Sequence, residues 1–313
     1  MHVLVTGGAG FIGSNLVRAL LSGGHQVFVV DDMSTGSAAN LDPRAGFRKM
    51  DILDDGLVEL VAQVAPEFVV HLAAQASVTV SLRDPERDRA VNAEGTRRVA
   101  AAARAAGVRR MLSASSAAVY GEPESLPLQE SASTVPMNPY GSSKLEAEGL
   151  LAAELAGSAT DYASLRFSNV YGPRQDAAGE GGVVAIFCDR IGKGEKPVVF
   201  GDGSQTRDFI YVGDVVGAIV QALTSDAALA YDEIPGSPYN ISTGERISVD
   251  GLIMALRPAA GYFGPVTYVA AREGDIVHSA LDPSRAEHAF GWQAGVELET
   301  GIAATWRWFS ALS

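Results

Sequence analysis

The first thirteen residues constrain the fold of this chain more than any other segment. Val3-Leu4-Val5-Thr6 is typical of a short buried strand, and it runs through a glycine turn into a helix that begins near Phe11. Gly7 and Gly10 would let the backbone turn tightly and approach a pyrophosphate, while Gly13 would let the helix lie close to the strand. A glycine-rich turn is weak evidence alone, but its position between a strand and a helix predicts a dinucleotide site.

Short apolar runs alternate with alanine-rich stretches through the first half of the chain. This pattern predicts an α/β fold of the Rossmann type, a doubly wound parallel sheet with helices on both faces. Asp84-Pro85 and Asn138-Pro139 mark two helix starts, because each pairs a capping side chain with a proline in the first turn. The first of these helices is expected to run to Ala106. Strands are expected at Val3–Thr6, Gln26–Val30, Arg48–Met50, Phe68–His71, Arg110–Ser113 and Tyr162–Arg166.

Glycine and proline become frequent after Ser168, which indicates a change of architecture. We expect residues 1–168 to form the dinucleotide-binding domain and residues 169–313 to form mostly a smaller, mixed α/β lobe that binds the substrate. Residues 206–228 are expected to form one more strand and helix that return to the first domain.

The charge and the cysteine count exclude several classes of function. The formal net charge is −13, and the chain has one cysteine and five histidines. Because a broadly acidic surface repels nucleic acid and anionic lipid, we expect neither nucleic acid nor a membrane as a partner. Cys188 alone allows no internal disulfide, and the histidines lack ligand spacing, so no metal is expected. No apolar run is long enough to span a bilayer, and we expect a cytoplasmic protein.

The second predicted strand ends in Asp31-Asp32, about 20 residues after the glycine turn. A carboxylate at this position can accept hydrogen bonds from both hydroxyls of an adenosine ribose, and it repels a 2′-phosphate. The sequence therefore favours NAD over NADP as the cofactor. Asp51-Ile52 closes the third strand and is expected to border the adenine.

A tyrosine and a lysine stand four residues apart at the start of a helix. Tyr140 and Lys144 therefore project from one face of that helix. A free phenol is a poor base at neutral pH, but a nearby ammonium and a cationic nicotinamide both favour the phenolate. Ser116 follows a predicted strand at the edge of the sheet where ligands bind, and it can share the proton of a substrate hydroxyl with Tyr140. We expect these three residues to be catalytic.

The chain resembles the extended short-chain dehydrogenase/reductases, and within them the UDP-glucose 4-epimerase group, over nearly its whole length. The matching segments are the glycine turn, Val29 to Gly36, His71 to Ser77, Asn92, Ser115 to Gly121, Tyr140 to Lys144, Leu165 to Arg174, Phe200 to Val212 and Arg272 to Asp275. The resemblance implies an NAD-dependent enzyme that acts on a UDP-sugar through a transient 4-keto sugar.

The resemblance also implies roles for individual residues. Lys144 would hold the nicotinamide ribose and Ser116 the 4-hydroxyl of the sugar. Arg207 and Arg272 would clamp the diphosphate, as a net-acidic protein needs local cations for that group. The other expected substrate contacts are Val78, Ala117, Asn169, Gly182, Val183, Val184, Val198, Phe200, Asp275 and Ser279. The other expected cofactor contacts are Phe11, Ile12, Ser34, Thr35, Gly36, Leu72, Ala73, Ala74, Gln75, Asn92, Ala114, Ser115 and Phe167.

Two alanines bear on the reaction. Related 4,6-dehydratases carry an Asp-Glu pair after the active-site serine, and related decarboxylases carry a glutamate, whereas this chain has Ala117-Ala118. Epimerisation at C4 of UDP-glucose or UDP-galactose is therefore the leading hypothesis. Ser279 leaves room for N-acetyl forms, while Asp176 would repel the acid group of UDP-glucuronate, so a glucuronate epimerase ranks lower.

Three alternatives stay open at this point: a UDP-glucuronate 4-epimerase, a 4-keto reductase or other sugar-nucleotide redox enzyme, and a non-catalytic NAD-sensing protein on the same fold. The helices Pro85–Ala106 and Tyr140–Leu155 carry alanine-rich faces. Because the resembling enzymes pair such helices across a two-fold axis, we expect a homodimer.

Overall fold

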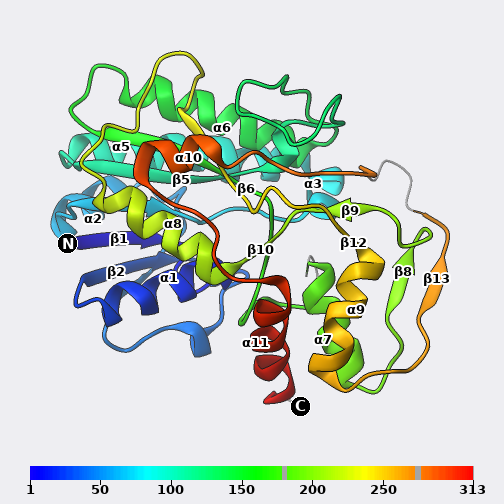
Figure 1. Cartoon of the computed structure of the whole chain (residues 1–313). Helices are drawn as coiled ribbons and strands as arrows, with labels where there is room; N and C mark the ends of the chain where they lie inside the picture. Colours follow the sequence, from blue (N-terminus) through cyan, green and yellow to red (C-terminus); the bar gives the residue numbers. More distant parts are fainter. Residues whose placement is uncertain (178–181, 272–275, 313) are drawn as a thin grey trace.

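A seven-stranded parallel sheet forms the centre of the molecule, which we describe from a computed structural model that covers residues 1–177, 182–271 and 276–312. The strand order is β11-β6-β5-β4-β1-β2-β3, with every neighbouring pair parallel (Figure 1). The strands are β1 (His2–Thr6), β2 (Gln26–Asp31), β3 (Gly46–Lys49), β4 (Phe68–His71), β5 (Arg110–Ser116), β6 (Asp161–Phe167) and β11 (Pro238–Ile241).

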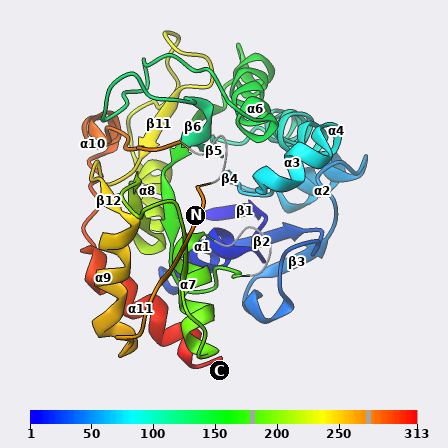
Figure 2. The same cartoon turned by 90° about the vertical axis from the view of Figure 1, so that its right-hand side faces the viewer.

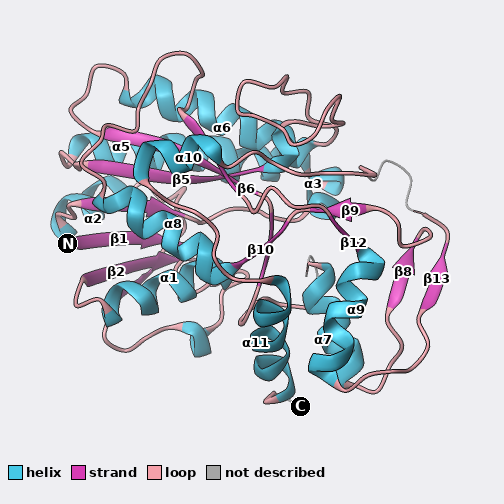
Figure 3. Ribbon diagram, in the orientation of Figure 1, coloured by secondary structure: helices cyan, strands magenta, loops and turns pink. Residues whose placement is uncertain are grey.

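Helices cover both faces of this sheet, as Figure 3 shows. Side chains of β1 alternate between the faces: Val3 and Val5 pack with α1, α8 and α10, whereas Leu4 packs with α2, α5 and α6. The predicted doubly wound Rossmann-type fold is therefore confirmed. The helices are α1 (Phe11–Ser22), α8 (Val212–Thr224) and α10 (Ser284–Phe290) on one face, and α2 (Leu57–Val64), α5 (Gly95–Ala105) and α6 (Pro139–Leu155) on the other.

A smaller lobe lies beside the sheet, with its own core of apolar side chains from α7, α9 and α11 (Figure 2). Its helices are α7 (Val183–Gly192), α9 (Val249–Ala260) and α11 (Leu298–Ser310). Three two-stranded sheets join or border it: β7 (Asn169–Tyr171) with β10 (Phe209–Tyr211), β9 (Thr206–Arg207) with β12 (Ile247–Ser248), and β8 (Val198–Phe200) with β13 (Thr267–Val269). Short 3-10 helices occur at η1 (Ala38–Asn40) and η3 (Ala117–Val119).

The observed strands differ from the predicted ones mainly at their ends. β5 continues to Ser116, three residues past its expected end. β3 covers Gly46–Lys49 instead of Arg48–Met50. β3 is the edge strand, and all four of its residues are exposed. The sequence therefore has no alternation of apolar and polar residues that would indicate where this strand begins and ends. The seventh strand, β11, was not predicted.

The segment 206–228 divides between two parts of the molecule. Its two strands lie outside the central sheet, where β9 pairs with β12 and β10 with β7, whereas α8 packs against α1 on one face of the sheet. Ile219 and Leu223 of α8 are fully buried in the core beneath the sheet. The strand that does join the main sheet is β11, which pairs with β6.

The helix expected from Pro85 to Ala106 is divided into α4 (Pro85–Arg89), a π-helical turn η2 (Ala90–Glu94) and α5, and α3 (Val78–Arg83) precedes it. A π turn inserts one residue into the helix, and such turns are frequent at functional sites. Here the turn contains Asn92, which lies buried against the loop after β4.

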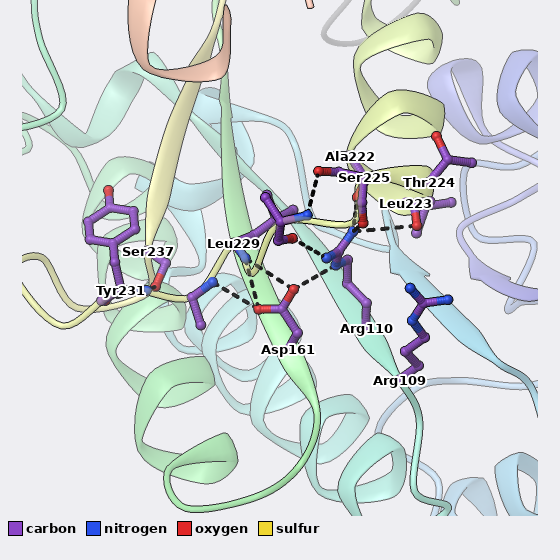
Figure 4. Close-up of polar contacts among 12 residues, drawn as sticks. Arg109, Arg110, Asp161, Ala222, Leu223, Thr224, Ser225, Leu229, Tyr231 and Ser237 are labelled. Carbon is purple, nitrogen blue, oxygen red and sulfur yellow. Dashed lines mark hydrogen bonds and ion pairs between the residues drawn. The ribbon is translucent and has the colours of Figure 1, made fainter. Parts of the chain in front are cut away.

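Arg110, at the first position of β5, joins the sheet to the end of α8 (Figure 4). Its guanidinium donates to Asp161 Oδ2 at 2.7 Å, to the carbonyl oxygens of Ser225 at 2.9 Å and Ala227 at 2.6 Å, and to that of Ala222. These bonds satisfy carbonyl groups that the helix leaves without partners at its end. Within the described ranges, no helix is long and apolar enough to cross a membrane.

Candidate active site

The glycine turn has the geometry that a dinucleotide site requires. Gly7 has φ 71°, and a Cβ there would lie 2.6 Å from the Ala73 nitrogen. A Cβ on Gly13 would collide with the Gly7 carbonyl, so α1 can lie close to β1 only with glycine at this position. Gly10 precedes α1 with no side chain capping the helix. The first turn of α1 therefore offers its backbone N–H groups, and Phe11 and Ile12 lie in that turn.

The carboxylate of Asp31 is buried at the tip of β2. Its Oδ2 accepts from Ala9 N and its Oδ1 from Met33 N, both at 2.9 Å. Asp31 thereby joins the glycine turn to the end of the second strand. Each carboxylate oxygen can accept a second bond, so Asp31 has acceptor capacity left for a ribose hydroxyl. A Cβ on Gly36 would lie 2.8 Å from Asp31 Oδ1, which explains a glycine there.

The neighbouring expected cofactor residues form ordered turns. Asp32 Oδ1 accepts from Ser34 N at 2.8 Å and from Ser34 Oγ at 2.7 Å, and Ser34 and Thr35 are exposed. Asp51 Oδ1 accepts from Leu53 N at 2.9 Å, and Ile52 is buried.

The loop after β4, from Leu72 to Gln75, is held to the π turn by a pair of hydrogen bonds. Gln75 N donates to Asn92 Oδ1, and Asn92 Nδ2 donates to Gln75 O, both at 2.9 Å. This loop passes over the glycine turn, since Leu72 N donates to Thr6 O and Ala73 N to Thr6 Oγ1. Leu72, Ala73 and Ala74 are half-buried.

His71 forms a buried chain of hydrogen bonds whose direction can be derived. Thr96 Oγ1 donates its one proton to Asn92 O at 2.6 Å, so it must accept from His71 Nε2 at 3.1 Å. His71 Nδ1 is then the acceptor, and Thr6 Oγ1 donates to it at 2.7 Å. Burial lowers the pKa of His71 to about 3, with a smaller effect from the positive charge of Lys144. His71 is therefore a neutral imidazole that joins β1, β4 and the π turn.

Tyr140 and Lys144 lie in the first turns of α6, which begins after Asn138. Asn138 Oδ1 accepts from Gly141 N at 2.9 Å and caps the helix. A Cβ on Gly141 would collide with the Ala118 carbonyl, so this turn packs directly on η3. Ser116 precedes η3 and its Oγ accepts from Ala118 N at 3.2 Å. The two segments that carry Tyr140 and Ser116 are therefore in contact.

Lys144 is a buried cation. Its Nζ donates to Ala114 O at 3.0 Å, and its side chain lies between α6 and β5. Burial lowers the pKa of Lys144 to about 8, while the negative charges of Asp88 and Glu148 act in the opposite direction. Ser115 Oγ donates to Glu148 Oε1 at 2.6 Å, so two successive residues of β5 are held by residues four apart on α6.

The expected substrate residues gather on the lobe and at the strand ends. Arg207 of β9 donates to Thr206 O at 2.9 Å and to Val277 O at 3.3 Å. Ser279 N donates to Thr206 O at 3.2 Å, so the segment of Ser279 lies against β9, which carries Arg207. Arg272 and Asp275 lie outside the described residues.

The other expected contacts differ in burial. Asn169 and Phe200 are exposed, while Val184 is buried in the core of the lobe and Phe167 in the core of the sheet. The half-buried members of the set are Val78, Ala114, Ala117, Gly182, Val183 and Val198.

Sequence reasoning missed three buried residues at the site: His71 as a hydrogen-bonding centre, Asp88 and Glu148. A signal was present for two of them, because Asp88 stands four residues before Asn92 and Glu148 four residues after Lys144. Such spacing places both carboxylates beside the expected site residues on the same helix faces.

Comparison with known proteins agrees with this geometry. The family model for the NAD dependent epimerase/dehydratase family matches residues 3–242. The UDP-glucose 4-epimerase of Mycolicibacterium smegmatis is 42% identical over 99% of this chain and 98% of its own. The UDP-glucose 4-epimerase of Thermotoga maritima, solved with UDP-glucose, is 38% identical with a TM-score of 0.93, and the match covers 100% of this chain and 99% of that one.

A UDP-N-acetylglucosamine 4-epimerase of Methanobrevibacter ruminantium has a TM-score of 0.92 at 32% identity, over 100% of this chain and 99% of that one. These matches extend over both the sheet and the lobe. The chain therefore belongs to the NAD dependent epimerase/dehydratase family.

Proposed function

We propose that this chain is an NAD-dependent UDP-hexose 4-epimerase. The expected substrates are UDP-glucose and UDP-galactose, and the N-acetyl forms of these two sugars are further candidate substrates. The observation that carries the proposal is the packing of α6 on η3 and β5, with Lys144 buried between them. This packing supports a site where Tyr140, Lys144 and Ser116 act on one substrate hydroxyl at the same sheet edge as the glycine turn.

The residues of the chain provide the acid–base chemistry of this reaction. Bound NAD would accept a hydride from C4 of the sugar and return it. The Lys144 ammonium favours the phenolate of Tyr140, which would remove the proton from the O4 hydroxyl, with Ser116 as the second hydrogen-bond partner of that hydroxyl. The 4-keto sugar must then present its other face before Tyr140 returns the proton. No external reductant is consumed.

The choice of sugar is supported by few residues. Ser279 is small and half-buried beside Arg207, which is compatible with a bulky substituent at C2 of the sugar. Asp176 is exposed in the loop that leads toward α7, and its charge disfavours the carboxylate of UDP-glucuronate. Neutral hexoses and N-acetylhexosamines are therefore favoured over glucuronate.

The decisive experiment incubates the purified protein with UDP-glucose, UDP-N-acetylglucosamine or UDP-glucuronate, without added NAD, and follows the anomeric proton signals by NMR. Appearance of the C4 epimer identifies both the reaction and the sugar. A requirement for stoichiometric NADH would contradict the proposal and favour a 4-keto reductase. Tight NAD binding with no turnover of any of the three sugars would favour an NAD sensor.

We also propose that the enzyme is a cytoplasmic homodimer. The resemblance to dimeric enzymes supports pairing through α5 and α6. However, Ala100, Ala102, Ala103 and Ala147 are buried within the chain itself, so a partner would meet mainly the charged outer face of these helices. Glu146 of α6 forms an ion pair there with Arg89 of α4. Sedimentation equilibrium at micromolar concentration tests the dimer, and cell fractionation tests the location.

A further inference from the structure

Asp88 is a fully buried carboxylate on α4 whose direct partners are all uncharged. Its Oδ2 accepts from Ser143 Oγ at 2.5 Å. Its Oδ1 accepts from Gln75 Nε2 at 2.5 Å and from Asn92 Nδ2 at 3.2 Å. A buried ionised group has a large desolvation cost, so its presence here needs a cause beyond these three hydrogen bonds.

The three partners belong to three separate segments of the expected site. Ser143 precedes Lys144 on α6, Gln75 ends the loop after β4, and Asn92 lies in the π turn. Asp88 therefore fixes the first turns of α6 relative to the loop that would line the cofactor. A neutral asparagine could hold the same segments, because Ser143 Oγ also lies 3.0 Å from Tyr140 O and could donate there while accepting from the amide.

The charges around Lys144 explain why a carboxylate is present instead. The negative charge of Glu148, also on α6, raises the pKa of Lys144. This charge is already neutralised by Arg166 of β6, which donates to both carboxylate oxygens of Glu148 at 2.9 Å and 2.6 Å. His71 of β4 is a neutral ring and brings no charge to Lys144, and Tyr140 lies one turn earlier on α6. Of the two described carboxylates whose charges raise the pKa of Lys144, Asp88 is thus the one whose direct partners are all uncharged, and it is bonded to Ser143, the residue next to Lys144.

We propose that Asp88 is a positioning residue of the active site, and that its buried negative charge keeps Lys144 in the ammonium form beside Tyr140. This inference rests on the proposed function, because an ammonium at this position matters only if Tyr140 is the base. The need is strongest when NAD is bound, since a cationic nicotinamide would further disfavour a second positive charge in the same site.

The test replaces Asp88 with asparagine, which removes the charge and keeps the shape. The pKa of Lys144 is measured by competitive labelling with acetic anhydride across a pH series, and the pH profile of kcat is measured in parallel. We expect the Lys144 pKa and the alkaline limb of kcat to shift downward by about one pH unit. The matched control is Asp84→Asn, an exposed carboxylate on the same helix that should leave both measurements unchanged because asparagine caps equally well.

A second variant separates charge from hydrogen bonding. Ser143→Ala removes one partner of Asp88 and keeps the charge, so it should lower kcat without moving the Lys144 pKa. An unchanged Lys144 pKa in Asp88→Asn would overturn the inference, whatever the activity. If no sugar is epimerised but the Lys144 pKa still falls in Asp88→Asn, the coupling between the two residues stands while the proposed function fails.

Discussion

The Nζ atom of Lys144 donates to the carbonyl oxygen of Ala114 at 3.0 Å, which ties the first turns of α6 to the end of β5. One turn later, Glu148 accepts from Ser115 Oγ at 2.6 Å. Two neighbouring residues of the strand are thus held by one face of the helix, and the next strand residue is Ser116. The relation between Ser116 and Tyr140 is therefore built into a buried contact between rigid elements and does not depend on a flexible loop.

Replacing Tyr140 with phenylalanine removes the phenol and keeps the ring. We expect kcat to fall by about 10²- to 10⁴-fold, the usual contribution of a positioned acid or base, with NAD affinity nearly unchanged. Steady-state epimerisation and NAD titration by fluorescence measure the two effects. Tyr162→Phe, on β6 and away from the sheet edge that binds ligands, is the control and should retain full activity. Normal turnover by Tyr140→Phe would reject the role of this phenol.

Asp31 and Asp32 are adjacent, but replacing each of them with asparagine should affect stability differently. Asp31 uses both oxygens to accept backbone N–H groups, so Asp31→Asn turns an NH₂ group against one of those donors. We expect the free energy of unfolding to fall by about 1–3 kcal/mol. Asp32 accepts both bonds from Ser34 through Oδ1 alone, and the Oδ1 of an asparagine could accept the same bonds. Asp32→Asn should therefore change the free energy of unfolding by less than about 0.5 kcal/mol. Urea denaturation compares them, and equal effects would contradict this account.

The neutral state of His71 predicts how stability depends on pH. Burial lowers the pKa of His71 in the folded chain to about 3 from its ordinary value of 6.5, so between these pH values the unfolded chain binds a proton that the folded chain does not. Stability must therefore fall as the pH drops below about 6.5, by ~1.4 kcal/mol per pH unit from this residue. His71→Asn should reduce that slope between pH 6.5 and 5, measured by urea denaturation. His288→Asn, at an exposed position, should leave the slope unchanged.

The sheet and the cofactor turn could be predicted because local sequence determines them. An apolar run followed by glycines at Gly7, Gly10 and Gly13 has few other structural solutions, and backbone geometry explains the glycines at Gly7 and Gly13. β11 escaped prediction since it has four residues, begins with Pro238 and pairs only after a long excursion through the lobe. Its place in the sheet is decided by tertiary packing.

The sequence could predict only those residues of the site that their type and spacing along the chain indicate. Tyr140 and Lys144 can be identified as a pair from their spacing on one helix. His71 cannot be identified in this way, because a histidine in sequence gives no sign that it will be buried. The spacing of Asp88 from Asn92 indicates a shared helix face, but not the burial of Asp88 or its bond to Ser143. Their roles arise from long-range contacts, such as Asp88 with Ser143, 55 residues away. Such contacts exist only once the sheet has brought α4 and α6 together.

The neighbouring arginines Arg109 and Arg110 predict effects on stability that differ in size. Arg110 is buried and donates to Asp161 and to carbonyl groups at the end of α8 (Figure 4), whereas the side chain of Arg109 is 56% exposed. Arg110→Met should lower the free energy of unfolding by about 3 kcal/mol, since it leaves the Asp161 carboxylate without its cationic partner and these carbonyls without a buried donor. Arg109→Met removes an exposed ion pair with Glu67 at 3.5 Å and should lower the free energy of unfolding by less than about 1 kcal/mol.

Thermal and urea unfolding measure this difference directly. Activity provides the second half of the test, because Arg110 lies at the amino end of β5 and Ser116 at the carboxyl end of the same strand. Below its unfolding transition, Arg110→Met should therefore epimerise its sugar with a kcat close to that of the unmodified enzyme. A large loss of kcat in the folded variant would mean that the end of α8 communicates with the active site through the sheet, in contradiction to a purely stabilising role for Arg110.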